Sequence, residues 1–239
     1  MTYQFNFLSI AEYVPLLVKG IGVTIELIVI GGALGLGMAV FCAWVRTQGP
    51  RWLSSLVGGY IEVFRNTPFL IQLFFIFFGL PSIGVQIGAM EAAILATVLN
   101  LGAYCAEIIR AGLGGIPRGQ REAAQCLAMT RVQVFRYVLL RPALQKVWPA
   151  ISSQLVIVML GSSVCSQIAV EELSYAANLI QSRDFRPFET YAVATVIYLM
   201  LAIILRYVLR LIGERYVVGR RVPRTRARLA MFRSGGQSA

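Results

Sequence analysis

The stretch that decides the fold is IGVTIELIVIGGALGLGMAVFCAWV, residues 21–45. Glu26 is its single charged side chain. An α-helix rises about 1.5 Å per residue and the hydrocarbon core of a bilayer is about 30 Å thick, so about 20 apolar residues cross it. The stretch is therefore predicted to span a membrane. The cluster Gly31-Gly32-x-x-Gly35-x-Gly37 follows no strand, so it favours close helix packing over a nucleotide loop.

The composition of the whole chain agrees with this. The 239 residues are 57% hydrophobic and 14% charged, with a mean hydropathy of +0.70. These values are typical of a polytopic membrane protein. At about 20 residues per span, the length allows about five or six spans and leaves no room for a separate soluble domain. We expect residues 1–239 to form one all-α integral membrane domain.

Unbroken apolar runs mark the individual spans, which we predict at about 21–45, 53–81, 88–110, 148–170 and 190–212.

The second span is the difficult one. Residues 68–81 are too short to cross alone, so the span must recruit residues 53–67. Glu62 and Arg65 then lie at the membrane, three residues apart on one helix face, where we expect a neutralising ion pair. Pro68 is expected to kink the helix or to begin its second half.

The basic residues predict the orientation of the spans. More than half of the 22 Lys and Arg fall in the loop at 111–147 and the tail at 213–239. The positive-inside rule puts these segments in the cytoplasm and the N-terminus outside. The net charge of +11 is then a topology signal, reinforced by attraction to anionic membrane lipid, and no nucleic acid partner is expected.

Several kinds of site are not expected. The four cysteines have no metal-ligand spacing and the chain has no histidine, so we predict neither a metal site nor a disulfide framework. The chain has no G-x-x-x-x-G-K-[ST] run, and therefore no phosphate-binding loop. Without a histidine or a Ser-Lys pair in a span, an intramembrane enzyme is disfavoured and no catalytic residue is expected.

A short helix is predicted in the basic loop, at residues 120–129, after a glycine-rich break. It presents three alanines beside the larger Leu127 and Met129. Small side chains let a partner's backbone approach, and the bulky ones can fill a groove. An amphipathic helix lying on the membrane explains this composition equally well.

This loop also resembles a known motif. Glu122-Ala123-Ala124-x-x-Leu127-Ala128, then Thr130-Arg131-x-Gln133 and Leu140-Arg141-Pro142-Ala143-Leu144, resemble the EAA loop of permease subunits of ATP-binding cassette (ABC) importers. The resemblance runs in order from Lys19 to Tyr216. Stretches that match the polar amino acid branch include Val23-Thr24-Ile25-Glu26-Leu27, Glu62-Val63-Phe64-Arg65-Asn66-Thr67-Pro68, Gln72-Leu73-Phe74-Phe75-Ile76, Ala103-Tyr104-Cys105-Ala106-Glu107-Ile108-Ile109-Arg110 and Phe185-Arg186-Pro187-Phe188-Glu189.

The resemblance implies a type I ABC importer permease of five transmembrane helices with a cytoplasmic coupling helix. That helix docks on a separate ATPase, which binds ATP and Mg²⁺ and drives alternating access. The residues that the resemblance places in this contact are Glu122, Ala123, Ala124, Gln125, Cys126, Leu127, Ala128, Met129, Thr130 and Arg131.

The resemblance also implies partners and a location. The partners are an ATPase dimer, a second permease and a periplasmic or lipid-anchored substrate-binding protein, and the location is the bacterial inner membrane. The cargo would be a polar amino acid or a derivative such as an opine. No cofactor is expected in this chain itself.

Two departures from the family pattern matter. Ala128 stands where the family usually has a glycine, and the proline of the loop's ending is shifted to Pro142. A glycine there would allow the positive φ of a tight turn. Alanine adopts a positive φ only with strain, so we expect a gentler turn at Ala128. Related permeases often carry a polar pair where this chain has Leu160-Gly161, so we expect a second, non-identical permease to make the principal substrate contacts.

Polar residues within the spans are the candidates for a translocation path. Asn100 and Tyr104 lie four residues apart on one helix face. For Tyr104, Ser162 and Ser163, hydrogen bonding between packed helices is an equally good explanation. The full candidate set is Asn100, Tyr104, Gln154, Ser162, Ser163 and Gln167.

The polar segment at 171–189 is predicted to lie at the outer surface. The resemblance makes it a contact for the binding protein, with charged residues steering the encounter. A solvated cap over the bundle is the alternative, and the sequence leaves both open. The candidate contact residues are Tyr175, Asn178, Arg183, Asp184 and Arg186.

A stand-alone secondary transporter of small polar solutes is the alternative function. It requires inverted repeats and a titratable or ion-binding centre at mid-membrane. Five spans divide badly into two repeats, and no such centre is visible in the sequence.

Overall fold

The computed structural model describes residues 5–217, whose regular elements are all helices, with no strand among them. The all-α prediction is confirmed. In chain order the elements are η1 Phe7–Tyr13, α1 Val14–Gln48, α2 Arg51–Arg65, α3 Phe69–Ser82, α4 Ala89–Gly114, α5 Arg118–Cys126, α6 Arg131–Gln133, η2 Val134–Leu139, α7 Leu140–Gly161, η3 Ser162–Ile168, α8 Leu173–Asp184, α9 Pro187–Ile212 and η4 Gly213–Val217.

Four helical stretches of the described chain are long and apolar enough to cross a membrane: Phe7–Gln48, Ala89–Gly114, Arg131–Ile168 and Pro187–Val217. Helices α2 and α3 pass this test only as a pair, so the count is four, or five if the pair forms one span. The first, third and fifth predicted spans fall on α1, α4 and α9.

The helices of the second and fourth predicted spans have unexpected shapes. Helices α2 and α3 meet at 110°, so Pro68 begins a second half of the pair, one of the two predicted outcomes, at a steeper angle than a kink. The helical stretch that contains the fourth predicted span begins at Arg131, well before residue 148. Thr130 explains the early start because it forms a capping box: its hydroxyl accepts from the Gln133 amide, and the Gln133 side chain accepts from the Thr130 amide.

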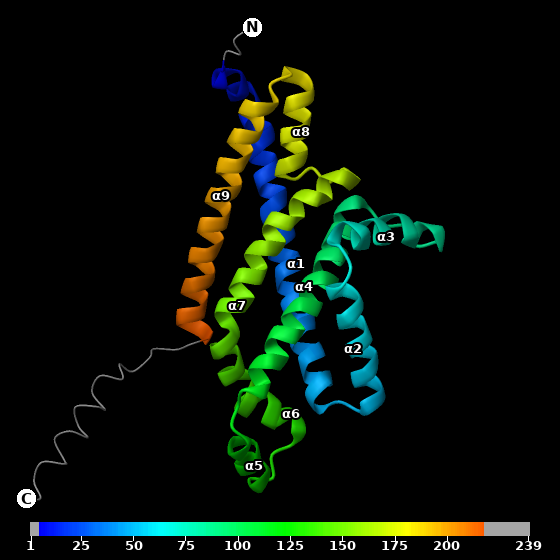
Figure 1. Ribbon diagram of the computed structural model, residues 1–239, viewed down its shortest axis with the longest axis vertical. Coiled ribbons are helices and arrows are strands. Elements are labelled where there is room, and N and C mark those ends of the chain that lie inside the picture. Colours follow the sequence, from blue (N-terminus) through cyan, green and yellow to red (C-terminus); the bar gives the residue numbers. More distant parts are fainter. Residues whose placement is uncertain (1–4, 218–239) are drawn as a thin grey trace, which may run out of the picture.

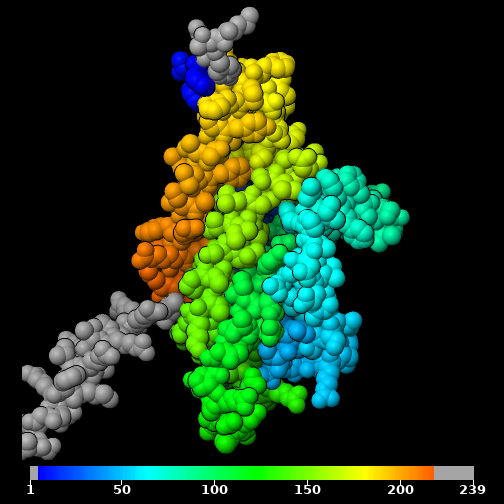
Figure 2. All heavy atoms as spheres, viewed as in Figure 1, coloured from blue at the N-terminus to red at the C-terminus, as the bar shows by residue number. Residues whose placement is uncertain are grey.

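The helices form an elongated bundle in which the predicted cytoplasmic parts gather at one end (Figure 1). Helices α5 and α6 and the α1–α2 turn lie at that end, where α9 also finishes, whereas η1 and α8 lie at the other. Helix α3 projects sideways from the bundle, and α5 forms a knob at the extremity (Figure 2). The basic tail beyond residue 217 lies outside the described residues.

Helices α1 and α4 form the centre of the bundle through close contact of small residues. A Cβ on Gly31 would lie 2.7 Å from Cγ2 of Thr97, and one on Gly35 would lie 3.0 Å from Cδ2 of Leu101. A side chain at either position would force Thr97 or Leu101 to shift. Gly31 and Gly35 therefore serve helix packing, as the sequence predicted, whereas a Cβ on Gly22 or Gly37 would meet open space.

The break between α2 and α3 has a local cause. Pro68 disfavours a helical Thr67 and has no amide hydrogen to continue the ladder. The side chain of Gln72 satisfies the exposed carbonyls, because its Nε2 donates to the oxygens of Phe64 (2.8 Å) and Thr67 (3.0 Å). The Tyr104 hydroxyl donates to the Arg65 oxygen at 3.1 Å.

The ion pair expected between Glu62 and Arg65 is absent among the described contacts, so that prediction is wrong. The Glu62 carboxylate accepts a hydrogen bond from the side-chain amide of Asn66 at 3.0 Å. The Arg65 guanidinium lies over the ring of Tyr104, with Cζ 5.8 Å from the centroid. The helix ends at once after Arg65, and both side chains find partners near that end.

The gentler turn expected at Ala128 is also wrong. Ala128 has a φ of 52°, in the left-handed region. The amide of Met129 donates to the Ala124 oxygen (3.2 Å) and that of Ala128 to the Gln125 oxygen (2.9 Å). This pair of bonds is the Schellman ending of a helix, which requires a positive φ at the residue where glycine is usual.

Candidate functional site

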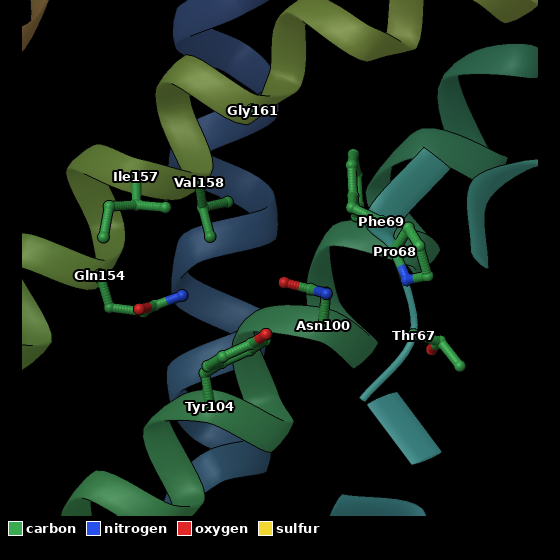
Figure 3. Close-up of a pocket in the computed structure, with 9 residues that line it drawn as sticks. All are labelled: Thr67, Pro68, Phe69, Asn100, Tyr104, Gln154, Ile157, Val158 and Gly161. Atoms are coloured by element: carbon green, nitrogen blue, oxygen red, sulfur yellow. The ribbon is translucent and has the colours of Figure 1, made fainter. Parts of the chain in front are cut away.

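A cavity of about 360 Å³ opens where the α2–α3 break faces α4 and α7. It combines the polar faces of two central helices with the irregular backbone of the break (Figure 3). Irregular backbone at membrane depth is tolerated where it is buried in protein or lines a cavity. The residues that line it are Thr67, Pro68, Phe69, Asn100, Tyr104, Gln154, Ile157, Val158 and Gly161.

Three of the six predicted path residues meet in this cavity: Asn100, Tyr104 and Gln154. The other three are elsewhere. The hydroxyl of Ser162 donates to the Met159 oxygen at 2.7 Å. The hydroxyl of Ser163 donates to the Leu160 oxygen at 2.8 Å, and Gln167 is exposed outside the cavity.

The side-chain amide of Gln72 orients the side chain of Asn100. Its Nδ2 donates to Oε1 of Gln72 at 2.9 Å, while Gln72 is itself held by the end of α2. The carbonyl oxygen of Asn100 therefore faces the cavity, as Figure 3 shows. The sequence analysis missed Gln72, although a lone glutamine within the apolar run FLIQLFFIF is a visible signal.

The remaining polar groups give the cavity its chemistry. Gln154 is half-buried, has no hydrogen-bond partner within residues 5–217, and points across the cavity toward Asn100 (Figure 3). The Tyr104 hydroxyl borders the same space. None of the lining side chains is ionisable apart from Tyr104, so the site offers hydrogen bonds to a polar solute and no fixed charge.

The predicted coupling segment is mostly exposed. Leu127, a large apolar residue directly after α5, is 76% exposed. Ala124 is buried against the bundle at 3%, so of the three alanines only Ala123 and Ala128 face outward. Lys146 of α7 donates to the Gly115 oxygen at 2.5 Å and ties the preceding loop to the bundle.

Contacts within the chain occupy several of the predicted binding-protein residues. Asp184 accepts from the Ser9 hydroxyl at 2.7 Å, and Arg186 donates to the buried Glu189 at 3.2 Å. Asn178 is exposed and accepts from Tyr191, whereas Arg183 is exposed with no partner in the described chain. The side chains of Asp184 and Arg186 are therefore engaged in contacts within the chain at this end of the bundle.

A buried carboxylate that the sequence analysis missed lies at the start of α8. Glu172 is fully buried, accepts from the Tyr175 amide at 2.9 Å and caps the helix. It also accepts from the Tyr198 hydroxyl of α9 at 2.6 Å. Burial raises the pKa of Glu172 above its ordinary value, and these hydrogen bonds oppose the rise.

Comparison with known proteins decides the family. A model of the family described as binding-protein-dependent transport system inner membrane component matches residues 31–218. The chain belongs to this family. It is a multi-pass membrane permease of ABC transport systems and is not itself catalytic. Permeases of this kind work with an ATPase and a second permease.

The permease is similar to full-length relatives. It is 34% identical over 215 residues to the glutamine transport system permease protein GlnP of Escherichia coli K12, which covers 89% of this chain and 98% of GlnP. A crystal structure of an amino acid ABC transporter with histidines matches with a TM-score of 0.79 and 34% identity, over 89% of this chain and 100% of that one. An inward-facing structure of the MetNI methionine ABC transporter matches with a TM-score of 0.66 and 25% identity, over 87% and 98%.

Proposed function

We propose that this permease is the transmembrane subunit of an ATP-driven importer for polar amino acids or their derivatives. A relative named for glutamine transport and the structure of an amino acid ABC transporter with histidines support the cargo class. The observation that carries the proposal is the pairing of a cavity with polar side chains in the bundle and an exposed helix in the basic loop at one end of it. We place that end in the cytoplasm of a bacterium, with the N-terminus outside the inner membrane.

The exposed helix α5 is the site at which the ATPase docks, through residues 122–131. Leu127 offers an apolar anchor, and Glu122 and Arg131 are exposed charges that fix the register. The ATPase binds ATP and Mg²⁺, because the permease has no phosphate-binding loop.

A continuous helical path connects this docking site to the cavity. The stretch Arg131–Ile168 begins at the Thr130 capping box and contains α7. Helix α7 carries Gln154 and Gly161, which line the cavity. A rigid-body shift of α5 therefore moves one wall of the cavity relative to α4, as alternating access requires.

The cavity is open on one side, and a second permease completes it. The lining of this chain has no charge to meet an ionised amino acid, so the second permease is non-identical and supplies that charge. A complex that transports with this permease alone beside the ATPase would contradict this part. The substrate-binding protein docks on the opposite end, where Tyr175, Asn178 and Arg183 lie.

The experiment is uptake of radiolabelled glutamine, histidine, arginine and octopine by cells that lack this gene, complemented with variants. Gln154→Leu is expected to reduce uptake of one of these solutes about ten-fold, because it removes a hydrogen-bonding group from the cavity. Ser163→Ala is the matched control and should stay within about two-fold. Unchanged uptake of all four solutes after deletion would contradict the proposal, and uptake that persists without the ATPase would favour a secondary transporter.

A further inference from the structure

A second polar site lies between α7 and α9, at the end of the bundle where α9 finishes. Two cavities of about 390 and 310 Å³ meet there and share Arg206 and Arg210. The larger is lined by Trp148, Pro149, Ser152, Ser153, Arg206, Arg210, Gly213 and Glu214. The smaller continues along α9 and is lined by Leu199, Ala202, Ile203, Arg206, Tyr207 and Arg210.

Two polar side chains of the larger cavity have no hydrogen-bond partner in the described protein. Arg206 is exposed and has no hydrogen-bond or ion-pair partner within residues 5–217. The hydroxyl oxygen of Ser152 is buried and likewise has no partner there. Arg210 is paired with Glu214 at 2.9 Å, so the cleft keeps a net positive charge from Arg206. A buried polar group without a partner requires an explanation.

The helices around the cleft are held at a fixed spacing. The indole of Trp148 donates to the Leu209 oxygen at 3.0 Å, and Gly213 leaves no room beside that indole for a Cβ. The cleft is therefore a built feature of the α7–α9 contact.

The smaller cavity is apolar and faces away from the bundle. Leu199 and Ile203 are 58% and 59% exposed, and they continue from Arg206 toward the middle of the span. Cations next to an apolar groove at a membrane boundary match the two halves of a phospholipid, a phosphate headgroup and an acyl chain. A protein partner would have to carry an acidic group into the membrane to meet Arg206, which is a costly placement.

We propose that this cleft binds one anionic phospholipid. The phosphate lies on Arg206 and Arg210, and an acyl chain follows the groove over Leu199 and Ile203. The lipid is phosphatidylglycerol-like, because the net positive charge of the cleft disfavours a cationic headgroup. The site is separate from the cavity at the α2–α3 break and does not depend on the transported solute.

The test is native mass spectrometry of the purified full-length permease in detergent, titrated with dioleoylphosphatidylglycerol or dioleoylphosphatidylcholine. We expect one tightly bound phosphatidylglycerol and at least ten-fold weaker binding of phosphatidylcholine. Arg206→Gln should weaken phosphatidylglycerol binding about ten-fold, whereas Arg51→Gln, which removes an exposed charge elsewhere, should change that binding less than two-fold. Ile203→Trp should weaken phosphatidylglycerol binding by filling the groove.

A second measurement separates binding from folding. Arg206→Gln breaks no hydrogen bond or ion pair in the described protein, so it should weaken phosphatidylglycerol binding without lowering the thermal unfolding temperature. Equal loss in Arg206→Gln and Arg51→Gln, or equal binding of the two lipids, would overturn the proposal. Complete displacement of phosphatidylglycerol by inorganic phosphate would also overturn the proposal. So would a permease that binds no lipid and loses its dimers in Arg206→Gln, because this face would then belong to a second copy.

Discussion

Ala128 shows how a single residue shapes the docking end. Its left-handed backbone closes α5 and lets Thr130 begin the next helix within two residues. A left-handed conformation costs an L-residue about 1–2 kcal/mol, and the Schellman bonds offset that cost. The turn is therefore sharp although no glycine occupies it.

The first prediction compares two Ala→Gly changes in this segment. Ala128→Gly removes the left-handed strain and should stabilise α5 by about 0.5–1 kcal/mol after the added chain entropy is subtracted. Ala123→Gly, in the exposed middle of α5, should destabilise it by about 1 kcal/mol. Hydrogen exchange of the α5 amides measures both, and slower exchange in Ala123→Gly than in Ala128→Gly would contradict this account.

Glu172 is a buried carboxylate outside the spans, and burial raises its pKa. Its folded pKa is raised by burial, so the folded state binds the proton more tightly than the unfolded state. The stability from this group is fully present below the unfolded pKa. It is lost as pH rises from that value through the raised folded pKa.

The second prediction follows from that sign. Tyr198→Phe removes a hydrogen bond to the buried carboxylate and should cost about 2 kcal/mol at pH 8, and less at pH 5, where the carboxyl is protonated to a greater extent. Glu172→Gln should remove the loss of stability that this group causes as pH rises. Thermal unfolding in detergent at pH 5 and pH 8 checks both variants. A greater cost of Tyr198→Phe at pH 5 than at pH 8 would show that the sign is wrong.

The α2–α3 break is the element on which the cavity depends. Proline ends α2, but Gln72 holds the break open. Its Nε2 donates to the Phe64 oxygen of α2 and to the Thr67 oxygen of the break, and its Oε1 accepts from the side-chain amide of Asn100. The projecting α3 is thus fixed to the bundle through polar contacts at its base.

The third prediction separates this structural glutamine from the cavity glutamine. Gln72→Leu leaves the Phe64 and Thr67 oxygens without this donor and should cost about 3 kcal/mol. Gln154→Leu breaks no hydrogen bond in the described chain and should change stability by less than about 0.5 kcal/mol. Thermal unfolding of the two variants provides the comparison. Equal destabilisation would contradict the roles assigned to them.

Apolar runs were sufficient to predict α1, α4 and α9, because length and hydropathy determine a membrane helix. They were insufficient at element ends, where single polar contacts decide. The capping box of Thr130 and Gln133 was readable and would have moved the fourth span's start. The steep α2–α3 angle goes with three bonds of Gln72, to the Phe64 and Thr67 oxygens and to the Asn100 side chain 28 residues away, and no local sequence pattern shows this combination. Of the site, Asn100, Tyr104 and Gln154 followed from helix faces, whereas the bonds of Ser162 and Ser163 needed coordinates.

At the scale of the whole molecule, the two ends of the bundle have different roles in our account. Cys126 is exposed at the α5 end, and Ser182 is exposed on α8 at the other. Both positions suit chemical labelling because neither side chain is packed in the bundle.

The fourth prediction concerns the orientation of these ends. A membrane-impermeant maleimide should label Cys126 in inside-out vesicles and leave it unlabelled in right-side-out vesicles. A Cys126→Ser, Ser182→Cys variant should show the reverse pattern, since α8 is expected outside. Labelling of both positions from the same side of the membrane would contradict the predicted orientation of the two ends of the bundle.

The central claim is that a separate ATPase drives this permease through α5. The most direct measurement is the amount of ATPase that co-purifies with tagged permease. A Glu122→Lys, Leu127→Asp variant should retain at least ten-fold less ATPase than the unmodified permease, because it reverses a register charge and puts a carboxylate at the apolar anchor. Arg51→Glu, a charge reversal at the same end but outside α5, should retain the normal amount. Normal retention by the Glu122→Lys, Leu127→Asp variant would contradict the account.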